Sequence, residues 1–349
     1  MTKRERFEKF LANEPVDRVP VAFFHHFTTE QEWLTGLKDE AAFEKNIEGH
    51  RTARAKFDPD VIKIMNDTLM IMPVDTSFVK TPADLRKIQP PMPGSAFFEK
   101  SKELTKRVVA IYEGSDAPIY ITAFSPCIIL RNSISGMDIG TEVAHSKLYS
   151  FLEEDPDSVM AALDIIADSV NALNKMLLTE CGAEAVYLSV NNQAHYVPDE
   201  FYAKYIAPSD KKVLAAANEL SRFNMLHICG YHGKSNNLEL FKDYDVPVFN
   251  WAVHAEGVGL AEGKKLFGGK PVCGGFAQAE TIYTGTREEI TAEVCKYLDE
   301  AGQVGVMLGA DCTVPTDIDD ERLARAESIY TVEHAKSLGI ELHYVNTAK

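Results

Sequence analysis

The stretch AVYLSVNN (185–192), followed by APSDKKVLAAANELSRF (207–223) and NMLHICG (224–230), contains the pattern that decides the fold. Its first and last segments are short, rich in β-formers and almost continuously apolar, which is typical of strands covered on both faces. The middle segment opens on proline and acidic residues, as helices often do. A strand, a helix and a second strand in this order predict a unit of an α/β fold with a parallel sheet.

Similar β-rich runs recur along the chain. They are VPVAFFHH (19–26), DVIKIMND (60–67), IYITAFSP (119–126), VPVFNWAVH (246–254), KPVCGGFA (270–277) and GVMLGADC (305–312). Helical patterns cover 155–182, 286–302 and 317–339, and Thr2 and Glu5 form a capping box for an opening helix. Strands interleaved with helices favour a (β/α)8 TIM barrel over an open doubly wound sheet. We expect one elaborated barrel domain over residues 1–349, with inserted helices and loops within 27–118.

Composition narrows the class of protein. The 349 residues are 45% hydrophobic and 25% charged, which is ordinary for a globular chain, and the net charge of −16 argues against nucleic acid or an anionic membrane as partner. The charged opening MTKRERFEKFLANEP is no signal peptide, and no run of about eighteen apolar residues is present. We therefore expect a cytoplasmic protein, in which the 6 cysteines are thiols or metal ligands and not a disulfide framework.

Polar residues follow the expected strands, where a barrel places its chemistry. His227 and Cys229 are two positions apart, so they share one face of their strand. Packing is the alternative reading for this pair alone, because buried cysteines and strand histidines are common. Cys312, at the end of the last expected strand, supplies a third ligand. Three protein ligands with an open fourth position are typical of catalytic zinc. Substrate contacts are expected from His25, Asn66, Asn191, Asn250 and Gln278.

The chain resembles the uroporphyrinogen decarboxylase superfamily and, within it, the zinc-dependent corrinoid methyltransferases, including those of the O-demethylase type. The resemblance runs from RVPV (18–21) through PDEFYAKYIAPSDKKV (198–213) and HICG (227–230) to GGFAQAETIYTGTREEI (274–290) and GADCTVPTDI (309–318). The methyltransferase branch has H-x-C followed much later by one cysteine. The resemblance therefore implies that His227, Cys229 and Cys312 bind Zn2+, and that a separate corrinoid protein supplies cobalamin.

The decarboxylase activity itself is an alternative that the sequence disfavours. That branch carries an arginine motif after the first strand for a porphyrin with eight carboxylates. Here the segment reads HHFTTEQEW (25–33), without an arginine, in an acidic protein.

Two directions of methyl transfer are open. In the first, which we favour because of the aromatic and amide-rich strand ends, a methoxylated aromatic compound gives its methyl group to the reduced corrinoid. In the second, methylcorrinoid methylates a thiol of the coenzyme M type. A non-catalytic metal-binding barrel is a further alternative, and the sequence leaves the oligomeric state open, with a homodimer as one candidate.

Overall fold

The computed structural model describes residues 1–56, 59–136, 142–192, 196–230, 233–315 and 318. Its centre is an 8-stranded parallel sheet in the order β1-β8-β7-β6-β5-β4-β3-β2. The strands are β1 (Val21–Ala22), β2 (Ile62–Ile64), β3 (Ile119–Phe124), β4 (Ala185–Val190), β5 (Met225–Ile228), β6 (Val248–Trp251), β7 (Val272–Phe276) and β8 (Val306–Ala310). Each lies within one of the expected runs, and the sheet curls into a nearly closed barrel, so the predicted fold class is confirmed.

β1 and β2 are the two edge strands of the sheet, and the barrel closes between them. There the buried Asp60 makes hydrogen bonds to β1 in place of some strand-to-strand hydrogen bonds. The backbone N–H of Asp60 donates to the Val21 carbonyl at 3.0 Å, and Asp60 Oδ2 accepts from the Val21 N–H at 2.9 Å. Arg6 and Arg18 pair with the same carboxylate at 2.7 and 2.6 Å. Both oxygens of this buried charge are therefore satisfied, as a buried carboxylate requires.

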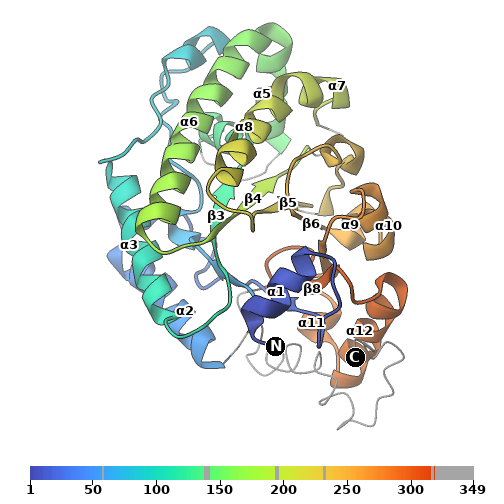
Figure 1. Ribbon diagram of the computed structural model, residues 1–349. Helices are drawn as coiled ribbons and strands as arrows, with labels where there is room; N and C mark the ends of the chain where they lie inside the picture. The colour runs from blue at the N-terminus through green and yellow to red at the C-terminus, as the bar shows by residue number, and fades with distance from the viewer. Residues whose placement is uncertain (57–58, 137–141, 193–195, 231–232, 316–317, 319–349) are drawn as a thin grey trace.

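Helices surround the strands, with α2 and α3 along one side of the barrel and α10 and α12 along the other (Figure 1). The helices are α1 (Lys3–Leu11), α2 (Glu40–Lys56), α3 (Ala96–Ile111), α4 (Pro126–Ile134), α5 (Glu142–Glu154), α6 (Pro156–Glu180), α7 (Asp199–Phe201), α8 (Ala207–Asn218), α9 (Val253–Glu256), α10 (Leu260–Leu266), α11 (Thr281–Thr284) and α12 (Arg287–Ala301). Short helices of other types lie at η1 (Asp67–Leu69), η2 (Pro82–Lys87), η3 (Tyr202–Ile206) and η5 (Leu238–Phe241). No helix in the described ranges is both long and apolar enough to cross a bilayer.

Most of the expected helices form where the pattern places them. The pattern at 155–182 is α6, that at 286–302 is α12, and α8 fills the first part of 207–223. The pattern at 317–339 lies outside the described residues, apart from residue 318. The insertion expected within 27–118 is built mainly from long loops, because α2 and α3 there each connect one barrel strand to the next.

Apolar side chains close the barrel at the amino ends of its strands. Helix α1 starts with the expected Thr2–Glu5 capping box and directs Phe7 and Phe10 toward the inward-facing side chains of the strands. The Phe7 ring meets the Tyr120 ring edge-on, with 6.3 Å between centroids. Because this end is filled, the inside of the barrel opens toward the carboxyl ends of the strands.

Candidate metal centre

One nitrogen and two sulfur ligand atoms converge at the carboxyl end of the barrel. His227 lies on β5, Cys229 directly follows that strand, and Cys312 follows β8. Cys312 Sγ is 3.8 Å from His227 Nε2, and the three ligand atoms all lie within 4.8 Å of one another. A tetrahedron with zinc–nitrogen and zinc–sulfur bonds has edges of about 3.5 Å, so a small contraction would seat the ion. The residues present therefore fit a zinc ion with one position left for another ligand.

Backbone hydrogen bonds hold the two cysteine segments in place. The N–H of Cys229 donates to the Val190 carbonyl of β4 at 2.8 Å, which continues the β4–β5 ladder past its last paired residues. On the other side, Asp311 N–H donates to Phe276 at 2.7 Å and Val314 N–H donates to Phe24 at 2.8 Å. Cys312 thus sits between two fixed backbone positions, although it comes from the far end of the chain.

Asn250 of β6 fixes the orientation of the His227 ring. Its Oδ1 lies 2.5 Å from His227 Nδ1 and accepts the Tyr187 hydroxyl at 2.9 Å, while its Nδ2 donates to the carbonyls of Cys273 and Ala310. The amide nitrogen is identified by those two carbonyls, so the oxygen faces the ring and Nδ1 carries the proton. His227 Nε2 is then the unprotonated nitrogen that a metal requires.

A buried lysine lies beside the thiols. Lys63 of β2 points into the barrel, with its Nζ 4.4 Å from the Tyr187 ring centroid and 5.1 Å from that of Phe24. Burial lowers the pKa of Lys63 to about 8, and the sulfurs of Cys312 and Cys229 oppose that shift. The pKa of the Cys312 thiol is lowered well below its usual range, chiefly by its hydrogen bond with Cys229. The thiolate is the form of cysteine that binds metal, so a lowered pKa favours metal binding by Cys312.

The three ligand residues line a cavity of about 770 Å³ of empty space, part of which is open to solvent. Its walls combine aromatic side chains, including Trp33 and Phe124, with the two cations Lys63 and Arg131. Asn66 and Asn191 also line it, as expected of substrate contacts, and that role stays a prediction.

Two other expected substrate contacts are placed differently. Asn250 is 2% exposed and its amide is fully used in holding His227 and the neighbouring strands, so it supports the site and does not face the cavity. Gln278 lies in the turn after β7 and is not among the described residues that line the cavity.

The expectation for His25 is corrected by its neighbour. Side chains alternate along the segment after β1, and Phe24 points inward to within 5.5 Å of Tyr187. His26 lines the cavity of the three ligand residues, held by Asp67 at 2.7 Å, whereas His25 lines a separate cavity beside His50. The backbone of His25 instead pairs with Val314, two residues after Cys312.

Sequence reasoning missed both buried cations. Lys63 interrupts the apolar run DVIKIMND (60–67), and Arg131 stands within α4, whose residues are all buried. A charged residue inside an otherwise apolar element was the available signal, because such residues are almost never fully buried without a reason.

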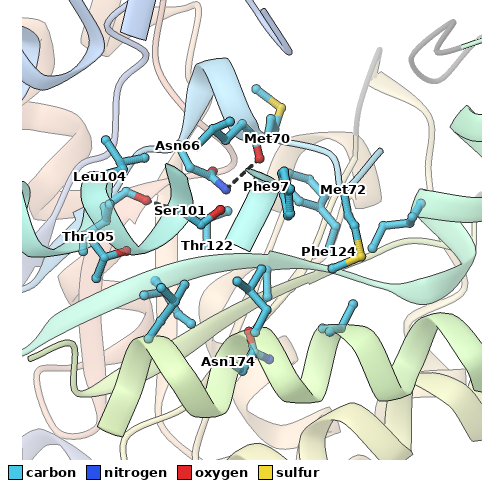
Figure 2. Close-up of a pocket in the computed structure, with 18 residues that line it drawn as sticks. Asn66, Met70, Met72, Phe97, Ser101, Leu104, Thr105, Thr122, Phe124 and Asn174 are labelled. Carbon is cyan, nitrogen blue, oxygen red and sulfur yellow. Dashed lines mark hydrogen bonds between the residues drawn. The ribbon is translucent and has the colours of Figure 1, made fainter. Parts of the chain in front are cut away.

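A second cavity of about 540 Å³ lies outside the barrel wall, between β2–β3 and helices α3 and α6. Figure 2 shows its polar side chains scattered among apolar ones, with Asn66 near η1 and Asn174 on α6. Asn66, Met70, Thr122 and Phe124 line both cavities, so the two adjoin along β3 and the segment that follows β2.

Known proteins resemble this chain over nearly its whole length. MtbA, a methylcobamide:CoM methyltransferase of Methanosarcina acetivorans, is 25% identical over 339 residues, covering 90% of this chain and 93% of the relative. The protein of the same name from Methanosarcina mazei is 27% identical over 330 residues, covering 88% and 91%.

Solved structures share the fold. A methyltransferase from Methanosarcina mazei superposes with a TM-score of 0.69 at 16% identity, covering 97% of this chain and 99% of that chain. A B12-independent methionine synthase from Shewanella sp. W3-18-1 superposes with a TM-score of 0.59 at 16% identity, covering 92% and 99%. The family model described as Uroporphyrinogen decarboxylase (URO-D) matches residues 2–328, and the chain therefore belongs to that family.

Proposed function

We propose that this protein is a zinc-dependent methyltransferase that moves a methyl group between a small substrate and the corrinoid of a separate protein. The observation that carries the proposal is the convergence of His227, Cys229 and Cys312 within 4.8 Å at the floor of a cavity. The relatives named methylcobamide:CoM methyltransferase, which align with about nine tenths of this chain, support the same class of reaction.

The residues of the site divide the work. His227, Cys229 and Cys312 would hold the ion, with Asn250 keeping the His227 ring in its metal-binding tautomer. Zinc bound there would act as a Lewis acid on the substrate's oxygen or sulfur. The aromatic walls would exclude water from the reacting atoms and strengthen the electrostatic effect of Lys63.

We propose as the direction the transfer from a methoxylated aromatic compound to reduced corrinoid. The carbon–oxygen bond would break with its electron pair left on oxygen, and the reduced corrinoid, as the second substrate, would supply the electron pair with which it accepts the methyl group. Lys63 gives its proton to the departing oxygen and is later reprotonated from solvent. A phenol has a pKa of about 10, above the value of about 8 for Lys63, so this proton transfer is downhill.

The second candidate is the reverse direction, in which a thiol takes the methyl group of methylcorrinoid. Both curated relatives favour it, because their names specify a methylcobamide donor and CoM as acceptor. In that direction, the charge of Lys63 would stabilise the substrate's thiolate beside the ligand sulfurs.

Decarboxylation of a porphyrin is less compatible with the cavity. Lys63 and Arg131 are the lysine and arginine side chains among its described lining residues, and two cations are too few to hold eight carboxylates. Membership of the family establishes a shared fold, and proteins with one fold can catalyse different reactions. The family's name therefore does not assign decarboxylation to this chain.

The test combines metal analysis with single-turnover spectroscopy. We expect about one zinc per chain. Mixing the zinc protein with cob(I)alamin and a panel of methoxybenzenes should produce the methylcobalamin spectrum, and mixing it with methylcobalamin and 2-mercaptoethanesulfonate should not. The opposite pattern would establish the thiol direction. Protein that folds without zinc and is silent in both assays, also with a corrinoid protein added, would overturn the proposal.

A further inference from the structure

Arg131 carries a buried positive charge that the described protein does not neutralise. It lies on α4 with 4% of its surface exposed, and it lines the cavity above the three ligand residues. Its Nη1 donates to Asn191 Oδ1 at 2.9 Å and lies 3.5 Å from His145 Nδ1. Both partners are neutral, because an arginine can only donate and His145 must therefore accept through Nδ1.

The rest of the guanidinium has no partner among the described residues. Nε is buried without a hydrogen bond, and no described carboxylate forms an ion pair with this side chain. By contrast, the buried Arg6 pairs with two carboxylates, Asp17 and Asp60, at 2.8 and 2.7 Å. A buried charge without a counter-ion is costly to the fold, so its presence at a cavity wall calls for a ligand that supplies the missing anion.

Asn191 holds the guanidinium in one orientation. Its side chain extends from the end of β4 and accepts one N–H, which leaves the other donors of the planar group for a second acceptor. Arg131 interacts electrostatically with Cys229, and the guanidinium and the ligand cluster line the same cavity. A small molecule could therefore place one end at the metal and another at Arg131.

We propose that Arg131 binds an anionic group, a carboxylate or a sulfonate, on the small substrate. This inference rests on the proposed function and deepens it, since it restricts the substrate to anions. In the first direction the substrate is a methoxylated aromatic acid, and in the second it is a thiol with an acidic tail. A planar guanidinium matches the two or three oxygens of such a group through paired hydrogen bonds.

The experiment compares charged and neutral probes on the zinc protein. The first arm uses 4-methoxybenzoate against methoxybenzene with cob(I)alamin, and the second uses 2-mercaptoethanesulfonate against 2-mercaptoethanol with methylcobalamin. We expect Arg131→Gln to lower kcat/KM for the anionic probe about 100-fold, and that for the neutral probe less than about threefold. Arg131→Lys should retain part of the preference. Arg222→Gln, which removes the same charge from a side chain that is 74% exposed, should leave the preference intact.

Calorimetric binding of the same two anions separates this inference from the proposed function. If the wild type turns over neither substrate pair but binds an anion that Arg131→Gln does not, the function fails and the anion site stands. Equal anion binding by wild type and Arg131→Gln overturns the anion site, whatever the activity. The Tm of the variants tests whether Arg131 only supports the fold. If it does, Arg131→Gln should have a much lower Tm than the wild type, whereas removal of an uncompensated buried charge should leave the Tm unchanged or raise it. A much lower Tm in both Arg131→Gln and Arg131→Lys, with anion binding retained, would also overturn the anion site.

Discussion

The cavity inside the barrel and the cavity outside it share the wall built from β2 and β3, but their chemistry differs. The inner cavity, of about 770 Å³, contains the histidine and two thiols of the ligand cluster together with Lys63 and Arg131. The outer cavity, of about 540 Å³, is lined by apolar side chains and the uncharged groups of Asn66, Ser101, Thr105, Thr122 and Asn174 (Figure 2). No described lining residue of the outer cavity carries an acidic, basic or thiol group.

The difference shows that volume alone does not identify a site. Both cavities contain empty space, but burying cations and ionised thiols costs free energy, whereas apolar walls with a few hydroxyls and amides cost little. The inner cavity retains its charges despite that cost, as expected where binding and catalysis require them. The outer cavity has the character of imperfect packing between the sheet and two helices. Changes on the two sides of this wall should therefore have different consequences.

Removal of one ligand sulfur should have the largest effect. We expect Cys312→Ser to lower the bound zinc below about one tenth of the wild-type content and to abolish methyl transfer, because a hydroxyl replaces a thiolate. Metal analysis and the cob(I)alamin assay measure both. Cys295→Ser, at a partly exposed cysteine outside the cluster, is the matched control and should change neither. Thr105→Val, in the outer cavity, should also retain its zinc. Loss of zinc in that variant would contradict the view that only the inner cavity is a metal site.

Loss of the buried ammonium should reduce turnover without releasing the metal. Lys63→Gln is expected to lower kcat for a methoxylated substrate about 100-fold at pH 7, while the zinc content stays that of the wild type. Burial sets the pKa of Lys63 at about 8, so its proton-donating form is lost as the pH rises through that value. The wild-type kcat should therefore fall above about pH 8, and the variant should lack this decline. An unchanged pH profile in Lys63→Gln would assign the proton to another group.

Release of the His227 ring should weaken zinc binding less than removal of a ligand. Asn250→Ala leaves Nδ1 of His227 without its acceptor, so the ring can adopt the wrong tautomer. We expect zinc affinity to fall about 10- to 100-fold in competition with a chelator. Asn174→Ala makes the same change in the outer cavity and should leave the affinity unaltered. Equal affinity for wild type and Asn250→Ala would mean that β5 alone orients the ring.

The sequence predicted the barrel because each strand is a compact apolar run, and such runs depend little on the rest of the fold. It also brought His227 and Cys229 to one face, since that requires only the two-residue period of a strand. The convergence with Cys312 depended on closing the barrel, and the parallel order of the strands supplies that.

Other features of the site could not be predicted because they depend on side-chain direction. His25 and His26 are adjacent in the sequence, and only the folded chain shows that His26 lines the cavity of the ligand cluster while His25 lines another. Asn250 was expected at a substrate, but its amide is used by His227 and two carbonyls from neighbouring strands. The apolar runs around Lys63 and Arg131 indicate that both are buried, but the cavity that both side chains line follows from the tertiary packing.

The smallest expected effect concerns stability and comes from the outer cavity. Asn174 is 3% exposed, and its Nδ2 has no hydrogen-bond partner among the described residues, so the folded state contains a desolvated donor there. Asn174→Leu replaces it with a side chain of similar size that suits the apolar walls and a helix interior. We expect the free energy of unfolding in urea to rise by about 1 kcal/mol, with zinc content and kcat unchanged. A fall of similar size would show that water or another ligand satisfies the amide, and the outer cavity would then be a binding site like the one proposed for the inner cavity.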